Sequence, residues 1–173
     1  MNWKSLSLLA AMVASCGSPV DNSKSITFQN ERYIPVEPNQ FFSSQWNDAF
    51  QAGKNYIAKG LIADLGYGLG MEHPNIMIVR EGSSSFEQVN TGQTGAVFMD
   101  PDQLEAVRAE HAAHGCSMMV KCLAYITFTV DSRQSKRYRL RLGRIIYQGD
   151  AQNVFDQIAA DMSALKETHG KGR

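Results

Sequence analysis

The chain has 173 residues, with 17 basic and 17 acidic side chains and a formal net charge of zero. This balance gives no global charge that would point to nucleic acid or to a strongly acidic partner. The length lies within the usual ~100–200 residues of one domain, and the hydrophobic content of 43% is ordinary for a globular protein.

The first sixteen residues, MNWKSLSLLAAMVASC, have the order of an export signal. Lys4 gives a positive start, residues 6–14 are apolar, and small residues precede Cys16. The apolar run is less than half of the ~20 residues that a membrane-spanning helix needs. We therefore predict that residues 1–15 are a signal peptide.

The ending Val13-Ala14-Ser15-Cys16 resembles the lipobox of bacterial lipoproteins. This resemblance implies cleavage before Cys16 and several acyl chains on that cysteine, which together anchor the protein, because stable anchoring needs more than one chain. In the enterobacterial sorting pattern an aspartate after the cysteine retains the protein in the inner membrane. Gly17 stands there instead, which favours the outer membrane. The alternatives are a plain secretory signal that contains a cysteine, or a first core element.

Residues 17–25 are small and polar, which is typical of a flexible tether, and a single domain is expected over residues 26–173. Residues 26–36 predict two short strands that meet near residues 29–31. Pro35 suggests an edge position in the sheet, because proline cannot donate a ladder hydrogen bond.

A helix is predicted over residues 44–65, because apolar residues recur there at spacings of four and seven. The stripe consists of Trp46, Phe50, Ile57, Leu61 and Leu65. Glycines at 66, 68 and 70 lack the full dinucleotide-binding fingerprint, so we interpret them as the end of the helix.

Short apolar runs over residues 75–80, 86–89 and 95–99 predict three more strands. A second helix follows. Asp100 is expected at its N-cap, with Gln103 in the capping-box position, and Gly115 after its last residue, His114.

Residues 120–130 and 136–147 predict the longest strand pair, joined by a polar turn over residues 131–135. The alternation of apolar and basic residues in the second strand breaks near Arg144. A bulge at Gly143 would return the later apolar residues to the buried face, so we predict a bulge there.

Asp150 is expected to cap a last helix over residues 151–168, whose stripe is Val154, Ile158, Met162 and Leu165. Together these elements predict an α+β domain. Its sheet would be mainly antiparallel, with about three amphipathic helices packed on one face.

Cys116 and Cys122 remain once Cys16 is assigned to the anchor, and an exported chain meets oxidising conditions. On one straight strand they would lie ~20 Å apart, beyond the ~7 Å limit for a disulfide. A disulfide therefore needs a turn within residues 117–121; the alternative is two unpaired core thiols.

Six basic side chains gather in the late strand pair and form a local patch in a neutral chain: Arg133, Lys136, Arg137, Arg139, Arg141 and Arg144. Such a patch can bind phosphate, lipid headgroups, acidic glycan or an acidic protein. The alternative is a solvated strand face whose charges protect the edge of the sheet.

His111 and His114, taken with the two cysteines, match no standard zinc spacing, so we expect no metal and no cofactor. Both histidines are interpreted as helix-end residues that favour the helix dipole.

The sequence therefore predicts a non-catalytic, lipid-anchored accessory protein of the cell envelope. Its expected partners are the membrane, through the anchor, and another envelope protein, with no nucleic acid. The alternative is an envelope hydrolase or small-ligand enzyme with a site near His73, Ser83, Ser84, Ser85 or Asp100.

Overall fold

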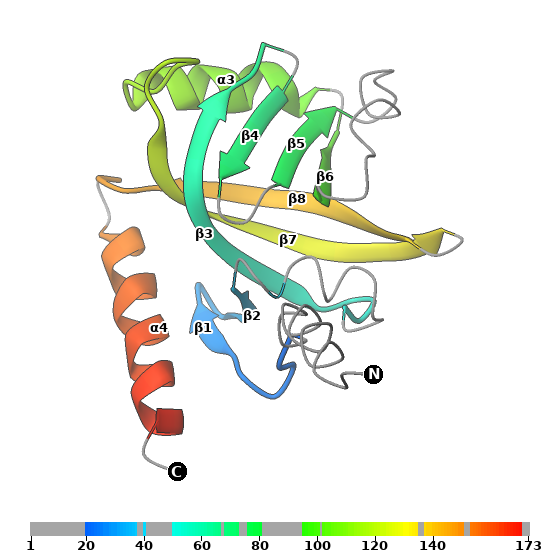
Figure 1. The fold of residues 1–173 in the computed structure, drawn as a ribbon, viewed down its shortest axis with the longest axis vertical. Helices are drawn as coiled ribbons and strands as arrows, with labels where there is room; N and C mark the ends of the chain where they lie inside the picture. Colours follow the sequence, from blue (N-terminus) through cyan, green and yellow to red (C-terminus); the bar gives the residue numbers. More distant parts are fainter. Residues whose placement is uncertain are drawn as a thin grey trace, which may run out of the picture.

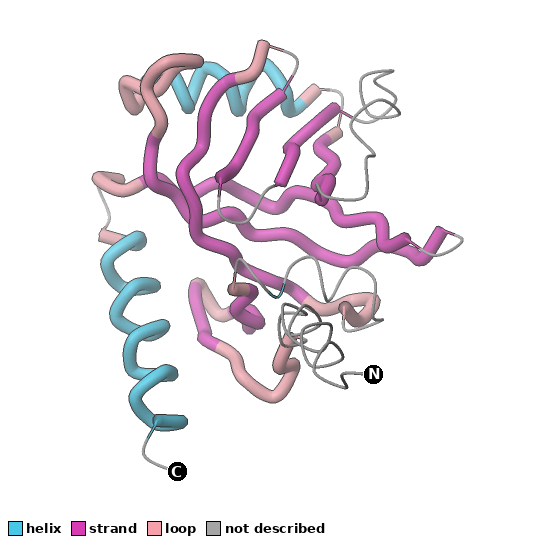
Figure 2. The backbone as a smooth tube through the Cα atoms, viewed as in Figure 1, coloured by secondary structure: helices cyan, strands magenta, loops and turns pink. Residues whose placement is uncertain are grey.

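The computed structural model describes residues 20–37, 40, 50–66, 68–72, 76–80, 95–100, 102–134, 137–150 and 153–170. The predicted export signal and the strand predicted over residues 86–89 lie outside this part. The described elements are shown in Figures 1 and 2. The strands are β1 (Ile26–Phe28), β2 (Glu31–Val36), β3 (Asn55–Asp64), β4 (Gly68–Glu72), β5 (Ile76–Arg80), β6 (Gly95–Met99), β7 (Cys122–Gln134) and β8 (Arg137–Tyr147). The helices are α3 (Gln103–Ala113) and α4 (Val154–Gly170).

Six of the strands close into a ring in the order β3, β4, β5, β6, β8 and β7, and β7 pairs back with β3. The pairs β5–β6 and β6–β8 are parallel, as is the pair β2–β3, which extends the sheet beyond the ring. The sheet is therefore mixed, and the prediction of a mainly antiparallel sheet was wrong. Hairpins between consecutive strands can be predicted from local sequence patterns. The parallel pair β6–β8 joins strands that are far apart in the sequence, so no local pattern predicts it.

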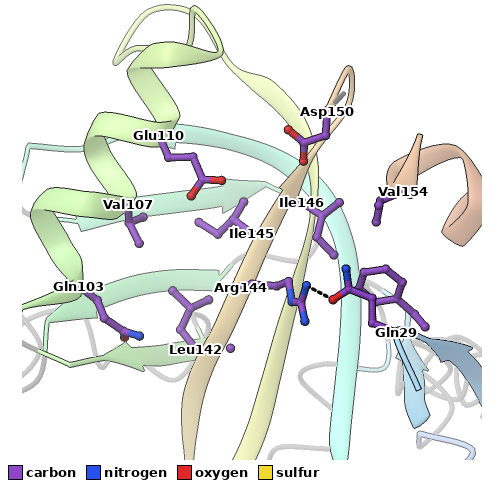
Figure 3. A pocket seen from close by; sticks show the side chains of 12 residues that line it. Gln29, Gln103, Val107, Glu110, Leu142, Arg144, Ile145, Ile146, Asp150 and Val154 are labelled. Atoms are coloured by element: carbon purple, nitrogen blue, oxygen red, sulfur yellow. Dashed lines mark hydrogen bonds between the residues drawn. The ribbon is translucent and has the colours of Figure 1, made fainter. Parts of the chain in front are cut away.

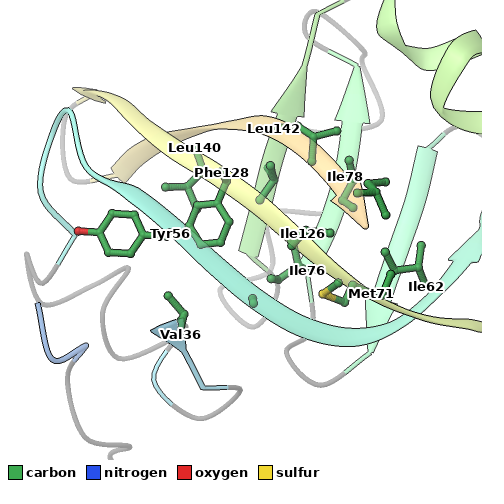
Figure 4. Close-up of a cluster of buried hydrophobic side chains, with 14 of the residues drawn as sticks. Val36, Tyr56, Ile62, Met71, Ile76, Ile78, Ile126, Phe128, Leu140 and Leu142 are labelled. Carbon is green, nitrogen blue, oxygen red and sulfur yellow. The ribbon is translucent and has the colours of Figure 1, made fainter. Parts of the chain in front are cut away.

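Side chains from every ring strand fill the interior of the ring (Figure 4). Alternate residues point inward, as the pleat of a strand requires. At Gly60 an added Cβ would lie 2.5 Å from the carbonyl oxygen of Glu72 and 2.6 Å from Cγ of Met71. The ring therefore encloses a packed core, as small closed sheets do.

The two described helices pack against different faces of the sheet. Leu104 and Val107 of α3 pack on the interior cluster. Phe155 and Ile158 of α4 pack on a second cluster that contains Ile57 and other residues of the outer face. Successive residues of a strand point to opposite faces, so the prediction of about three helices on one face was wrong.

The predicted helix over residues 44–65 is wrong where the structure describes it, because residues 55–64 form β3. Tyr56, Ile57 and Ala58 are all buried, and Leu61, which was placed on the apolar stripe, is 39% exposed. A strand that is covered on both faces has an almost continuous apolar run. Such a run contains helical spacings by chance.

The interpretation of the glycines after β3 as the end of a helix was wrong: Gly66 lies in a hairpin turn, and Gly68 and Gly70 belong to β4. Gly66 has a φ of +82°, and the backbone N–H of Leu65 donates to the carbonyl of Gly68 over 2.8 Å. The left-handed conformation that suggested a helix stop is equally suited to a tight turn between strands.

The first hairpin is confirmed. Gln29 and Asn30 both have positive φ, which is the geometry of a two-residue turn between twisted strands. Pro35 lies beyond Tyr33, the last residue of β2 that pairs with β1. Pro35 has no partner in β1, so its missing N–H costs no hydrogen bond between β1 and β2.

The second predicted helix is confirmed as α3. The prediction of Asp100 as its N-cap was wrong, because α3 begins at Gln103 and its N-cap is Asp102. The side chain of Gln103 accepts a hydrogen bond from the backbone N–H of Asp100 over 2.9 Å, which is one half of the predicted capping box. At the other end, Gly115 has a φ of +73° and donates to the carbonyl of Ala112.

The predicted bulge at Gly143 is also confirmed. The register shifts between the pairs Ile126–Ile145 and Phe128–Leu142, so β8 has one residue more than β7 in this stretch. A second shift follows Val130 on β7. β7 continues to residue 134, so the turn predicted over residues 131–135 starts later than expected.

Asp150 does not cap the last helix, which was a wrong prediction. α4 begins at Val154, and its first turn is closed by the N–H of Gln157 donating to the carbonyl of Asn153. The Asp150 carboxylate instead accepts from the backbone N–H of Tyr147 over 3.2 Å.

Residues 20–25 belong to the folded body, so the prediction of a flexible tether over residues 17–25 was wrong for these residues, which are the part of that range that the structure describes. Val20 is buried in the interior cluster. The side chain of Asn22 accepts a hydrogen bond from the hydroxyl of Tyr56 over 2.9 Å. Small polar residues were taken for a linker, although one apolar residue and one amide fix them to the core.

Candidate functional site

A groove of about 450 Å³ lies between α3, the bulge of β8 and the turn between β1 and β2 (Figure 3). We call it the bulge groove. Two other cavities in the described part of the chain are smaller, at about 270 and 70 Å³. Its apolar lining is Phe28, Val107, Leu142, Ile145, Ile146 and Val154, and its polar lining includes Gln29, Gln103, Glu110, Arg144 and Asp150.

The bulge determines where Arg144 lies. A Cβ on Gly143 would come within 2.6 Å of the Thr127 hydroxyl oxygen, so only glycine fits against that side chain. The same hydroxyl accepts a hydrogen bond from the backbone N–H of Arg144 over 2.9 Å. The extra residue and this hydrogen bond together place the Arg144 side chain at the groove.

The guanidinium of Arg144 has two neighbours at the turn between β1 and β2. It donates a hydrogen bond to the side-chain oxygen of Gln29, and it lies over the ring of Phe28 at 5.1 Å from the ring centre. These contacts hold a cation at one side of the groove.

Tyr33 lies near this cation. Burial, together with a hydrogen bond to Glu31, raises the pKa of Tyr33 to about 12, while Arg144 opposes the shift. The phenol of Tyr33 is therefore neutral at physiological pH and donates to the Glu31 carboxylate.

Two carboxylates, Glu110 and Asp150, lie on the side of the groove away from Gln29 (Figure 3). Oδ1 of Asp150 lies 3.0 Å from Nε2 of His114. The ring of His114 also stacks on Tyr147, with 4.4 Å between ring centres. The bulge groove therefore has an arginine at one side and acids at the other.

His111 lies in the core, which corrects its interpretation as a helix-end charge. It is 1% exposed, and its Nδ1 lies 3.0 Å from the hydroxyl of Tyr147. Its Nε2 has no hydrogen-bond partner among the described residues. Burial lowers the pKa of His111, so the ring is neutral at physiological pH and adds no charge to the helix dipole.

Of the six residues of the predicted basic patch, the structure describes the side chains of Arg141 and Arg144. Arg144 lines the bulge groove, and Arg141 forms an ion pair with Asp100 at 3.4 Å. The backbones of Arg133, Arg137 and Arg139 belong to the paired ends of β7 and β8, which project from the body in Figure 1. Their side chains and all of Lys136 lie outside the described part.

Cys116 and Cys122 form a disulfide, with 5.7 Å between their Cα atoms. The turn that this bond requires lies where the sequence placed it, because the N–H of Ser117 donates to the carbonyl of Val120 over 2.9 Å. Thiolates that are joined in this way are not metal ligands.

The residues proposed for an enzyme site are not brought together in the described part of the chain. His73, Ser83, Ser84 and Ser85 lie outside it. Asp100 lies at the start of α3, where its backbone N–H donates to Gln103 and its carboxylate pairs with Arg141.

The sequence did not reveal the groove residues Gln29, Gln103 and Glu110, because the turn between β1 and β2 contributes the first and α3, which is distant in the sequence, contributes the other two. One signal was available, since the predicted bulge already placed Arg144 off the regular strand alternation. Knowing that α3 lies beside the bulge required the pairing of β6 with β8.

Comparisons with protein-family models, with curated proteins and with solved structures found no match to this chain. Within the described residues, no group of three or more histidine, cysteine, aspartate or glutamate side chains is arranged to hold a metal ion. None of the described helices has the length and apolar character needed to cross a membrane.

Proposed function

We propose that this protein is a lipid-anchored accessory protein of the bacterial cell envelope, which binds another envelope protein through the bulge groove and does not catalyse a reaction. The observation that carries the proposal is the groove itself. It combines apolar walls with a few polar groups that converge on it, which is the usual composition of a binding site.

The expected location is supported by the disulfide between Cys116 and Cys122, because such bonds persist in oxidising compartments such as the periplasm. The anchor is proposed at Cys16, four residues before the buried Val20. With Gly17 after the cysteine, the periplasmic face of the outer membrane is the favoured site.

The charges of the groove indicate what kind of partner segment it binds. Arg144 suits a carboxylate, whereas Glu110 and Asp150 suit a basic side chain or an amide donor. A segment of a partner protein that carries both kinds of group, separated by an apolar residue, would complement all three. We propose such a segment as the ligand.

The anchor is tested by substituting Cys16→Ser in the full chain expressed in a bacterial host. We expect the protein to leave the membrane fraction and to lose the mass of its acyl chains. A variant that keeps its membrane association and its mass would show that the lipoprotein assignment is wrong.

The groove is tested by placing a photoreactive amino acid at Gln103, which lines it, and a control one at Gln157 on the exposed side of α4. Irradiation of intact cells should give a discrete protein adduct from position 103 alone. The added substitution Arg144→Glu should reduce this adduct at least about tenfold, the equivalent of 1.4 kcal/mol. Equal adducts from both positions would contradict the proposal.

A further inference from the structure

Three consecutive apolar side chains are exposed in the loop between α3 and β7. Met118, Met119 and Val120 are 61%, 88% and 53% exposed. Among the described residues, Leu61 is the one other large apolar side chain that is classed as exposed. We call residues 116–122 the apolar loop.

The apolar loop is held in one conformation by its own bonds. The disulfide joins its two ends, and the N–H of Ser117 donates to the carbonyl of Val120. The hydroxyl of Ser117 accepts from the N–H groups of Met119 and Val120, over 3.2 and 3.1 Å. A preorganised loop of this kind binds without the entropic cost of ordering its backbone.

The position of the apolar loop indicates whether it faces the anchoring membrane or points away from it. The described chain begins at Val20 and ends at Gly170, both in the lower part of Figure 1, whereas the apolar loop lies at the top. Four residues from Cys16 to Val20 span at most ~14 Å. This step rests on the proposed function: a body anchored at Cys16 points its apolar loop away from the membrane.

The charges around the loop favour a protein over a lipid surface. Lys121 is paired with Glu72 at 2.5 Å between Nζ and Oε1, and Nε2 of His114 lies 3.0 Å from the carboxylate of Asp150. Glu110 is exposed in the last turn of α3. Loops that bind anionic bilayers carry an excess of positive charge. The described side chains around the apolar loop have no such excess, because Lys121 is balanced by Glu72 and Glu110 adds a negative charge.

We propose that the apolar loop is a docking element that inserts Met118 and Met119 into an apolar socket of a partner protein on the side away from the anchoring membrane. Methionine side chains are unbranched and flexible, and their sulfur atoms pack well on aromatic rings. The expected socket is therefore lined by aromatic and aliphatic side chains. Val120, which follows the two methionines in the sequence, contacts the rim of this socket.

The test uses the full-length protein in intact cells, with a photoreactive amino acid at Met119 and a control one at Gln157. We expect a discrete protein adduct from position 119 that position 157 does not give. The added substitutions Met118→Ser and Val120→Ser keep the three hydrogen bonds between Ser117 and the loop backbone. They should reduce the adduct at least about tenfold, because they remove apolar area from the contact.

A second variant protects this test against misfolding. Met118→Gln changes one side chain that is 61% exposed, and the disulfide of each variant is checked by its resistance to thiol labelling. A folded Met118→Gln variant that gives an unchanged adduct overturns the proposal.

Three further results would overturn the proposal. Adducts with lipid would mean that the loop contacts a membrane, and an adduct of twice the chain mass would mean that it contacts a second copy. Adducts no stronger than those of the control position would mean that the loop does not dock. The Cys16→Ser test is separate from these results, because the anchor can fail while the adduct at position 119 remains.

Discussion

The two ends of the closed ring are held together by different interactions. At one end, the ring of Tyr56 stacks on Phe128, and Phe50 packs against both with its edge. At the other end, α3 is joined to β8 by the contact of His111 with Tyr147, and the disulfide closes the loop that follows α3. We refer to these as the aromatic end and the α3 end.

This difference places the large buried aromatic rings at one end of the closed ring and the proposed binding surfaces at the other. The aromatic end is closed by large buried rings, with Val20 in the same cluster, and contributes mainly apolar burial. The α3 end adds ion pairs, a buried histidine and a covalent link to the apolar packing of Leu104 and Val107. Both proposed binding features, the bulge groove and the apolar loop, border α3. Binding surfaces need exposed polar or apolar groups, so stability has to come from elsewhere in the fold.

The largest expected effect is at the aromatic end. Phe128 is 1% exposed, and its removal in Phe128→Ala should destabilise the protein by about 3–5 kcal/mol, as for other buried phenylalanines. Urea unfolding monitored by tryptophan fluorescence measures this loss. Phe128→Leu is the matched control and should cost much less, because it keeps most of the volume. Equal losses would mean that volume does not determine stability at this end.

The disulfide at the α3 end should contribute less. Its seven-residue loop is short, so the double substitution Cys116→Ser with Cys122→Ser is expected to cost about 2 kcal/mol. The same urea experiment with a reductant should lower the wild-type midpoint and leave the double variant unchanged. A loss as large as that of Phe128→Ala would remove the contrast between the two ends.

The bulge should show a smaller effect that depends on one neighbour. The substitution Gly143→Ala places a Cβ 2.6 Å from the Thr127 hydroxyl, and such overpacking costs about 1–3 kcal/mol. The additional substitution Thr127→Ala removes that oxygen, so the two losses should not add. Strict additivity in the double variant would show that the contact does not impose glycine at this position.

Local features of the fold could be predicted from the sequence because each depends on neighbouring residues. The bulge at Gly143 followed from broken alternation, and the turn between the cysteines followed from their spacing. β3 was missed because a strand covered on both faces lacks alternation. Closure of the ring and the bulge groove were missed because they depend on pairing between distant strands, such as β3 with β7.

The last expected effect is a dependence on pH that comes from the α3 end alone. Burial lowers the pKa of His111 below its ordinary value of 6.5, despite the nearby charge of Asp64. As the pH falls, the unfolded chain therefore binds this proton before the folded chain does, so the contribution of His111 to stability is present above about pH 6.5 and is lost on acidification.

Urea midpoints at about pH 8 and about pH 5 measure the change. In His111→Asn the part of the change due to this ring should disappear, whereas Phe128→Ala should leave it intact. Acidification that stabilised the wild type relative to His111→Asn would contradict this prediction. It would mean that the folded protein favours the charged form of His111, so that this charge and not a neutral buried ring would stabilise the α3 end.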